Sequence, residues 1–256
     1  MARGSRIGST TGFYHIRDIG CNHQMIFLET RDYRKFRYIL QDEKKKTEVT
    51  IIAYCLMGNH VHLLAGGEPE QIAKFEQLVK GRYAQWYNDK YQRSGPLFDG
   101  RYRAKAVKDM RQFYALLRYI HVNPVAAGLA KSVDEYEFSS YNCYMGQKDD
   151  LVDPDFVLAE LDETDFISLH QKVADGREFD IPQRKPRLVD EQALEIILEI
   201  AGVTHPSQVQ HLSPAFRNLV LAELRRRGLA VRQICRLTGL SKYQVVSAGQ
   251  GSDPLS

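Results

Sequence analysis

The chain has 256 residues, of which 43% are hydrophobic and 26% are charged, a composition typical of a globular protein with one sizeable domain and a smaller one. Its net charge of +3 permits a nucleic-acid partner without requiring one. The four scattered cysteines argue against a disulfide scaffold and a zinc finger. Because there is neither a secretory signal nor an apolar run long enough to span a bilayer, we expect a cytoplasmic protein without membrane association.

The first part of the chain alternates predicted strands and helices. Residues 12–18 alternate apolar and polar side chains, which predicts a half-buried strand, and residues 32–46 carry one apolar stripe, which predicts a surface helix. Residues 48–57 are β-branched and apolar, as in a strand. Gly58 and Asn59 then predict a tight turn into a second strand that begins at His60.

A long amphipathic helix is predicted over residues 68–92, and glycine and proline break the pattern over residues 93–100. Residues 101–107 alternate again as a strand, and residues 109–124 predict a helix that Pro124 terminates. The order βαββαβ, followed by a further helix, predicts an α+β fold. We expect a ferredoxin-like antiparallel sheet with helices on one face.

Changes in composition divide the chain into five expected regions. Acidic turns, a proline-containing linker and a helical pattern follow the core in that order. The expected regions are a core at 1–133, an acidic extension that wraps the core at 134–174, a linker at 175–188, a small all-α domain at 189–249 and a flexible tail at 250–256.

Two histidines stand one residue apart in the apolar segment YCLMGNHVHLL. On a strand, His60 and His62 project from one face while Val61 points to the other. Two adjacent imidazoles can share one divalent ion. Two strand histidines held by ordinary hydrogen bonds explain the pattern equally well.

Tyr119 and Asn123 are four residues apart in a predicted helix, so they lie on one face about a turn from each other. A tyrosine can be a covalent nucleophile when a metal or base assists it, and an asparagine can supply an oxygen ligand. The alternative is that Tyr119 is a core aromatic and Asn123 only the residue before Pro124. For the helix in isolation this alternative is favoured.

Taken together, the motifs resemble those of the REP-associated tyrosine transposases. These form a bacterial branch of the histidine-hydrophobic-histidine (HUH) nucleases, which act on single-stranded DNA. Five segments carry the resemblance, in family order and over about residues 5–175: GFYHIRDIGCNHQMIF, YCLMGNHVHLL, GPLFDGRYRAKAV, LLRYIHVNPVAAGL and YEFSSYNCYMG. One departure is His23, which stands where relatives commonly have arginine.

The resemblance implies the roles of four residues. His60 and His62 would be metal ligands, Asn123 the third protein ligand and Tyr119 the nucleophile. The implied activity is metal-dependent cleavage and strand transfer of single-stranded DNA through a 5′-phosphotyrosine intermediate, at a hairpin or repetitive palindrome and without ATP. With nitrogen and oxygen ligands, Mg²⁺ or Mn²⁺ is the expected ion. The expected location is the bacterial cytoplasm, in association with the nucleoid.

Basic residues concentrate in the middle of the chain, where residues 74–111 contain ten lysines and arginines against four acidic residues, with aromatic residues between them. Cations for phosphates and rings for bases suit a single strand. The expected phosphate contacts are Arg82, and Arg101, Arg103 and Lys105 on one strand face. The alternative is a solvated helix with its aromatic rings in the core.

The segment VRQICRLTGLSKYQV near the C-terminus resembles a helix-turn-helix, with Ser241 as the cap of its second helix. That helix would present Lys242, Tyr243 and Gln244 to DNA, and the domain could bind a duplex beside the cleavage site. A small helical bundle that contacts protein is the alternative.

Two other functions remain in competition. A zinc metallohydrolase would use the histidine pair, but no further HxHxD or HExxH pattern accompanies it. A catalytically silent DNA-binding regulator could keep the same fold. Among the other histidines, we expect a structural hydrogen bond for His15, and His121 lies on the wrong helix face for a ligand. The sequence is compatible with a monomer and with a dimer.

Overall fold

The computed structural model describes residues 8–100, 103–171 and 190–248, so the expected linker at 175–188 and tail at 250–256 lie outside the described residues. The chain divides into two compact units. The first comprises Met1–Asp18, Glu29–Tyr83 and Arg101–Ile181, and the second comprises Ile19–Leu28, Ala84–Gly100 and Pro182–Ser256. Each unit is described by itself below.

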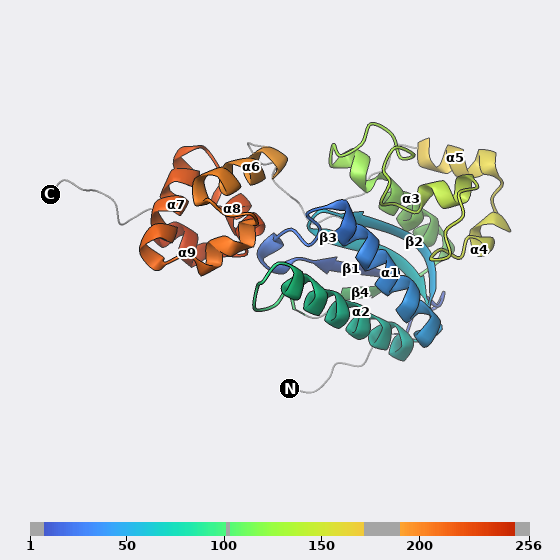
Figure 1. The fold of residues 1–256 in the computed structure, drawn as a ribbon. Coiled ribbons are helices and arrows are strands. Elements are labelled where there is room, and N and C mark those ends of the chain that lie inside the picture. The colour runs from blue at the N-terminus through green and yellow to red at the C-terminus, as the bar shows by residue number, and fades with distance from the viewer. Residues whose placement is uncertain (1–7, 101–102, 172–189, 249–256) are drawn as a thin grey trace. The chain divides into compact units, whose positions relative to one another are not determined.

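A four-stranded sheet forms the centre of the first unit (Figure 1). Its strands are β1 (Phe13–Ile19), β2 (Thr50–Met57), β3 (His60–Gly66) and β4 (Arg103–Ala106), in the spatial order β2-β3-β1-β4. The crossover helices are α1 (Thr30–Thr47) and α2 (Pro69–Lys90). This is the ferredoxin-like βαββαβ order, and the predicted fold class is confirmed.

The two faces of the sheet are covered by different helices. Phe13 packs its ring 4.8 Å from that of Phe113 in α3 (Met110–Ala126), whereas Asp18, on the opposite face of β1, forms an ion pair with Lys80 of α2 at 2.9 Å. The two crossover helices therefore share one face, and α3 covers the other. His15 lies on the α3 face because it is two residues from Phe13.

The prediction that Pro124 terminates the third helix was wrong. Pro124 lies inside α3, which continues to Ala126. Proline fixes a φ angle that is compatible with a helix, and what it removes is its own amide hydrogen bond. Close to the end of a helix this loss is tolerated, and the amide of Ala127 still donates to the carbonyl of Asn123 at 2.9 Å.

The segment that follows α3 covers the outer edge of β2. The amide of Leu56 donates to the carbonyl of Phe138 at 2.9 Å, and the amide of Ser140 donates to the carbonyl of Tyr54 at 3.0 Å. Short helices complete this extension: η2 (Tyr141–Met145), α4 (Asp155–Leu158) and α5 (Glu163–Gln171). An edge strand of the sheet thereby gains main-chain partners from the same chain.

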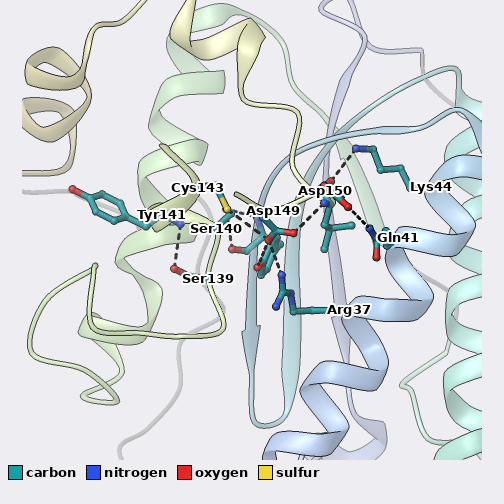
Figure 2. Close-up of polar contacts among 11 residues, drawn as sticks. Arg37, Gln41, Lys44, Ser139, Ser140, Tyr141, Cys143, Asp149 and Asp150 are labelled. Atoms are coloured by element: carbon teal, nitrogen blue, oxygen red, sulfur yellow. Dashed lines mark hydrogen bonds and ion pairs between the residues drawn. The ribbon is translucent and has the colours of Figure 1, made fainter. Parts of the chain in front are cut away.

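Polar side chains fasten the extension to α1 and β2, as Figure 2 shows. The carboxylate of Asp149 accepts hydrogen bonds from Arg37 at 2.8 Å and from the hydroxyl of Tyr54 at 2.9 Å. Lys44 donates to Asp153 at 2.7 Å, and Asp153 also accepts from the amide of Ile51 at 2.9 Å. The acidic character of this segment thus meets cations on α1.

In the second unit, the described part of the C-terminal segment forms short helical elements around an apolar core. They are α6 (Asp190–Ala201), η4 (Pro206–His211), α7 (Pro214–Arg226), α8 (Val231–Thr238) and α9 (Lys242–Ser247). The unit also includes the 3₁₀ turn η1 (Cys21–His23), and the amide of Met25 beside this turn donates to the carbonyl of Arg236 at 3.0 Å. A segment from near the start of the chain is therefore part of the C-terminal fold.

Gly239 makes the turn between α8 and α9. Its φ of 75° lies in the left-handed region, and a Cβ atom there would lie 2.4 Å from the Gln210 side chain. Glycine meets both requirements. Within the described ranges, no helix has the length and apolar character needed to cross a membrane.

Candidate active site

His60 and His62 lie on the face of β3 that α3 covers. In the antiparallel register they stand opposite Met57 and Cys55 of β2. Their ring centroids are 5.0 Å apart and the rings are perpendicular. His60 is 7% exposed and His62 is completely buried, so neither imidazole is an ordinary surface side chain.

Tyr119 reaches the same place from α3. Its ring centroid is 5.4 Å from that of His62, at an interplanar angle of 89°, and its side chain is buried. Asn123, one turn further along, donates its amide nitrogen to the carbonyl of Tyr119 at 3.2 Å. Because this bond uses the nitrogen, the amide oxygen of Asn123 is the atom that can serve as a ligand.

Each of the two imidazoles has a hydrogen-bond partner on its Nδ1 atom. Nδ1 of His60 lies 2.7 Å from the amide oxygen of Asn59, and Nδ1 of His62 lies 2.9 Å from Nε2 of His15. The opposite nitrogen of His62, Nε2, is buried and has no hydrogen-bond partner. A buried polar atom without a partner is uncommon and calls for an explanation.

Burial favours the neutral forms of His62 and His15. It lowers the pKa of His62 well below the ordinary value, and the charges of His60, His15 and Arg17 lower that pKa further. Burial, together with the charges of Arg17 and Lys105, lowers the pKa of His15 to about 3. A neutral imidazole has a lone pair, which a metal ligand requires.

The residues present fit a divalent ion. Among the residues with described positions, no three His, Cys, Asp or Glu side chains form a metal-binding group, which gives the zinc metallohydrolase alternative no support. Imidazole nitrogens and an amide oxygen are donor types that suit such an ion, and the buried Nε2 of His62 has no hydrogen-bond partner.

Cations from β1 and β4 lie on the same face of the sheet. Lys105 pairs with His15 and Arg103 pairs with Arg17 in the antiparallel register, so all four positions share one face. Arg101 and the side chain of Arg103 lie outside the described residues. Sequence reasoning missed Arg17, although its spacing of two residues from His15 on a strand could have indicated it.

Arg82, which the sequence predicted as a phosphate contact, instead pairs with acidic residues of the protein. Its guanidinium forms ion pairs with Asp42 and Glu43 of α1, which neutralise its charge within the protein. Among the aromatic residues of this segment, Tyr83 is completely buried and Tyr87 is 2% exposed, which favours the alternative with rings in the core. Bases cannot reach rings that lie in the core.

In the second unit, two of the three residues expected to face DNA are open to solvent. Tyr243 is 81% exposed and Lys242 is also exposed. The amide oxygen of Gln244, in contrast, accepts from the amide and the hydroxyl of Ser241 at 3.0 and 2.9 Å. Gln244 therefore belongs to the capping box that begins α9.

A second buried histidine pair joins α3 to the extension. Nδ1 of His121 lies 2.9 Å from Nε2 of His170, and Nε2 of His121 lies 2.8 Å from the hydroxyl of Ser140. Nδ1 of His170 donates to the carbonyl of Phe166 at 2.8 Å. His121 thus points away from the first pair.

Residues 13–123 match the family described as IS200-like transposases. This segment contains the sheet, the histidine pair, Tyr119 and Asn123. This part of the chain is therefore similar to a transposase domain, and domains of that family process DNA. The resemblance to a transposase family that the motifs indicated is confirmed by this match.

Two solved structures are similar in part. One is described as the REP-associated tyrosine transposase bound to a REP hairpin; it is 18% identical, and the match covers 60% of this chain and 94% of that chain with a TM-score of 0.49. The other is a candidate transposase from Deinococcus radiodurans R1; it is 20% identical, and the match covers 44% of this chain and 89% of that chain with a TM-score of 0.33. No curated protein matched the chain.

Proposed function

We propose that this protein is a metal-dependent endonuclease and strand transferase for single-stranded DNA, with Tyr119 as the nucleophile. The observation that carries the proposal is the convergence of Tyr119 on the histidine pair, with ring centroids 5.4 Å apart at His62. The sequence motifs of tyrosine transposases support it. In this chemistry, a nucleophile must lie beside the group that activates the phosphate.

Three side chains would hold Mg²⁺ or Mn²⁺: those of His60, His62 and Asn123. When bound, the ion supplies charge neutralisation at an oxygen of the scissile phosphodiester. His62 and Tyr119 are both buried, so most of each side chain is shielded from bulk water.

Tyr119 forms a phosphorus–oxygen bond through its phenolic oxygen as the bond to the 3′ oxygen of the DNA breaks. The 3′ oxygen leaves as a hydroxyl group, and the 5′ phosphate stays on the tyrosine. One phosphodiester replaces another, so the step is nearly balanced in free energy and needs no ATP. A second 3′ hydroxyl can reverse it, which is strand transfer.

Charged residues on the sheet face would guide the DNA. Lys105 and Arg17 share the face of His15, and the same strand pattern adds Arg101 and Arg103 as phosphate contacts. The motif resemblance supports a hairpin or repetitive palindrome as substrate, within the nucleoid of a bacterial cell. In the second unit, Lys242 and Tyr243 would contact the adjacent duplex.

The proposal can be tested by looking for a covalent adduct between the protein and DNA. Purified protein with a single-stranded hairpin oligonucleotide and Mg²⁺ or Mn²⁺ should give a shifted protein–DNA band on a denaturing gel. Tyr119→Phe should give none, because phenylalanine lacks the nucleophilic oxygen. Tyr114→Phe, on the same helix, is the matched control and should give the wild-type band.

Two results would contradict the proposal. An equal band from Tyr119→Phe would exclude Tyr119 as the nucleophile. A wild-type protein that shifts the hairpin on a native gel but never forms an adduct would favour the silent DNA-binding regulator. Duplex DNA and an unrelated single strand, tested in parallel, separate cleavage from simple binding.

A further inference from the structure

The two proposed metal ligands each have a hydrogen-bond neighbour on Nδ1. For His60 this neighbour is Asn59, whose amide oxygen lies 2.7 Å from Nδ1. For His62 it is His15, whose Nε2 lies 2.9 Å from Nδ1. In metal sites such outer partners determine which ring nitrogen has the proton and where the ring points.

In the hydrogen bond between His60 and Asn59, only one of the two atoms can be the donor. An amide oxygen accepts hydrogen bonds and cannot donate them, so Nδ1 of His60 must be the donor. A neutral imidazole has one proton, and Nε2 of His60 therefore has the lone pair. The turn residue Asn59 thus prepares His60 as an Nε2 ligand before any ion binds.

The contact between His15 and His62 could run in either direction, because both partners are imidazoles. In one direction His15 donates, and the proton of His62 then lies on the buried Nε2, where it blocks a metal ion. In the other direction His62 donates from Nδ1, and its Nε2 keeps a lone pair. Only the second arrangement makes the unpartnered Nε2 atom a ligand.

We propose that His15 is a positioning residue that fixes His62 with the proton on Nδ1 and the lone pair on Nε2, as Asn59 does for His60. The inference rests on the proposed function for the identity of the ligands. His15 would not contact the ion, because its Nε2 is used on the far side of the His62 ring. Its ring lies at 18° to that of His62, with centroids 5.2 Å apart, which also limits rotation of His62.

Burial makes the two partners unequal. His15 is 7% exposed and His62 is completely buried, so water cannot take over the contact when His15 is replaced. Asn59 lies in the turn before β3 and is only half-buried, so water can reach Nδ1 of His60 when Asn59 is replaced. We therefore expect a larger effect from His15 than from Asn59.

The direct test needs no metal ion. Nitrogen-15 NMR of the full-length, metal-free protein, with labelled histidine, reports which nitrogen of each ring is protonated. We expect the proton of both His60 and His62 on Nδ1. A proton on Nε2 of His62 in the wild-type protein would overturn the inference.

The second test is Mn²⁺ affinity, measured by the electron paramagnetic resonance signal of free Mn²⁺. His15→Phe keeps a ring but removes the acceptor, and should weaken binding about 10-fold to 100-fold. His15→Gln places an amide oxygen near the position of Nε2 and should keep the affinity within a few-fold. Asn59→Ala should fall between the two.

The outcomes separate this inference from the proposed function. If the wild-type protein binds no Mn²⁺, the metal proposal fails, whereas the NMR result still decides the role of His15. If His15→Phe folds and binds Mn²⁺ like the wild type, the positioning role is refuted while the metal site stands. If His15→Phe does not fold, a proton of His62 that moves to Nε2 in His15→Leu supports the inference, and one that stays on Nδ1 opposes it.

Discussion

The first unit contains two buried histidine pairs with nearly the same geometry. They differ in the hydrogen-bond partners of the ring nitrogens that do not join the two rings. In each pair a hydrogen bond of 2.9 Å joins Nδ1 of one ring to Nε2 of the other, and the rings are close to parallel. The pair of His121 and His170 continues into Ser140 on one side and the carbonyl of Phe166 on the other. The pair of His15 and His62 ends in a nitrogen without a partner.

The hydrogen bonds around the pair of His121 and His170 have one consistent set of donors. We call this the closed pair, because every ring nitrogen has a partner, and we call the pair of His15 and His62 the open pair. The carbonyl of Phe166 only accepts, so His170 donates to it from Nδ1, His121 donates to His170, and the hydroxyl of Ser140 can donate to His121. Every ring nitrogen is satisfied, which suits a structural role. According to the proposals above, the same contact stabilises the fold in the pair of His121 and His170 and prepares a metal ligand in the pair of His15 and His62.

The largest expected effect comes from replacing one member of each pair by glutamine. His62→Gln should abolish the covalent DNA adduct, because the Nε2 ligand is lost, and should change the free energy of unfolding by about 1 kcal/mol or less. His121→Gln should do the opposite. It should lower the free energy of unfolding by about 2 kcal/mol, because the amide of glutamine has a donor and an acceptor but does not place both where the two ring nitrogens of His121 lie, and it should keep the adduct.

Urea denaturation measures the stability of the two variants, and the denaturing gel measures their adduct formation. Adduct formation is scored per folded molecule, so that a loss of stability is not counted as a loss of activity. If both variants lost activity and stability to the same degree, the two histidine pairs would not have the different roles proposed for them.

A smaller, pH-dependent effect should come from the closed pair. Burial lowers the pKa of His170 to about 4 and that of His121 well below its ordinary value. The unfolded chain therefore binds protons at a higher pH than the folded one, so stability is complete above about pH 6.5 and falls as the pH decreases toward 4. For His170 alone the loss at pH 4 is about 3 kcal/mol.

Urea denaturation of the wild type and His170→Gln at several values between pH 7.5 and pH 4.5 measures this dependence. The variant should be less stable at pH 7.5 but should lose less stability on acidification, because it lacks one of the titrating groups. Parallel curves for the two proteins would assign the acid sensitivity to other buried histidines.

The smallest expected effect concerns DNA affinity beside the open pair. Lys105→Ala should weaken binding of a single-stranded oligonucleotide and reduce the dependence of log affinity on log salt by about 1, since one phosphate contact is lost. Lys148→Ala, an exposed lysine in the extension, is the matched control. Fluorescence anisotropy at several salt concentrations distinguishes them, and equal slopes for both variants would remove Lys105 from the DNA-binding surface.

The sequence predicted the parts of the site that depend on local periodicity. His60 and His62 share a face because strand residues alternate, and Tyr119 and Asn123 lie a turn apart because a helix repeats at that spacing. The strand and helix order also sufficed for the βαββαβ fold. These features need only neighbouring residues. The contact between Tyr119 and His62 joins two distant segments, and the sequence indicated it only through the family resemblance.

Long-range partners could not be predicted in the same way. Nothing near Arg82 in the sequence indicates its ion pairs with Asp42 and Glu43, which come from another helix. The bond from His121 to His170 spans 49 residues. The structural bond expected for His15 is present, but its partner, His62, depends on how the sheet is assembled.

The cover on the outer edge of β2 has a practical consequence for shortened forms of the protein. A domain cut at residue 133 would contain the whole histidine site, yet it would expose the main-chain groups of β2 that Phe138 and Ser140 now occupy. Bare sheet edges pair with one another and promote aggregation. A minimal domain that resists aggregation should therefore retain the chain at least as far as Asp153, whose carboxylate accepts from the amide of Ile51.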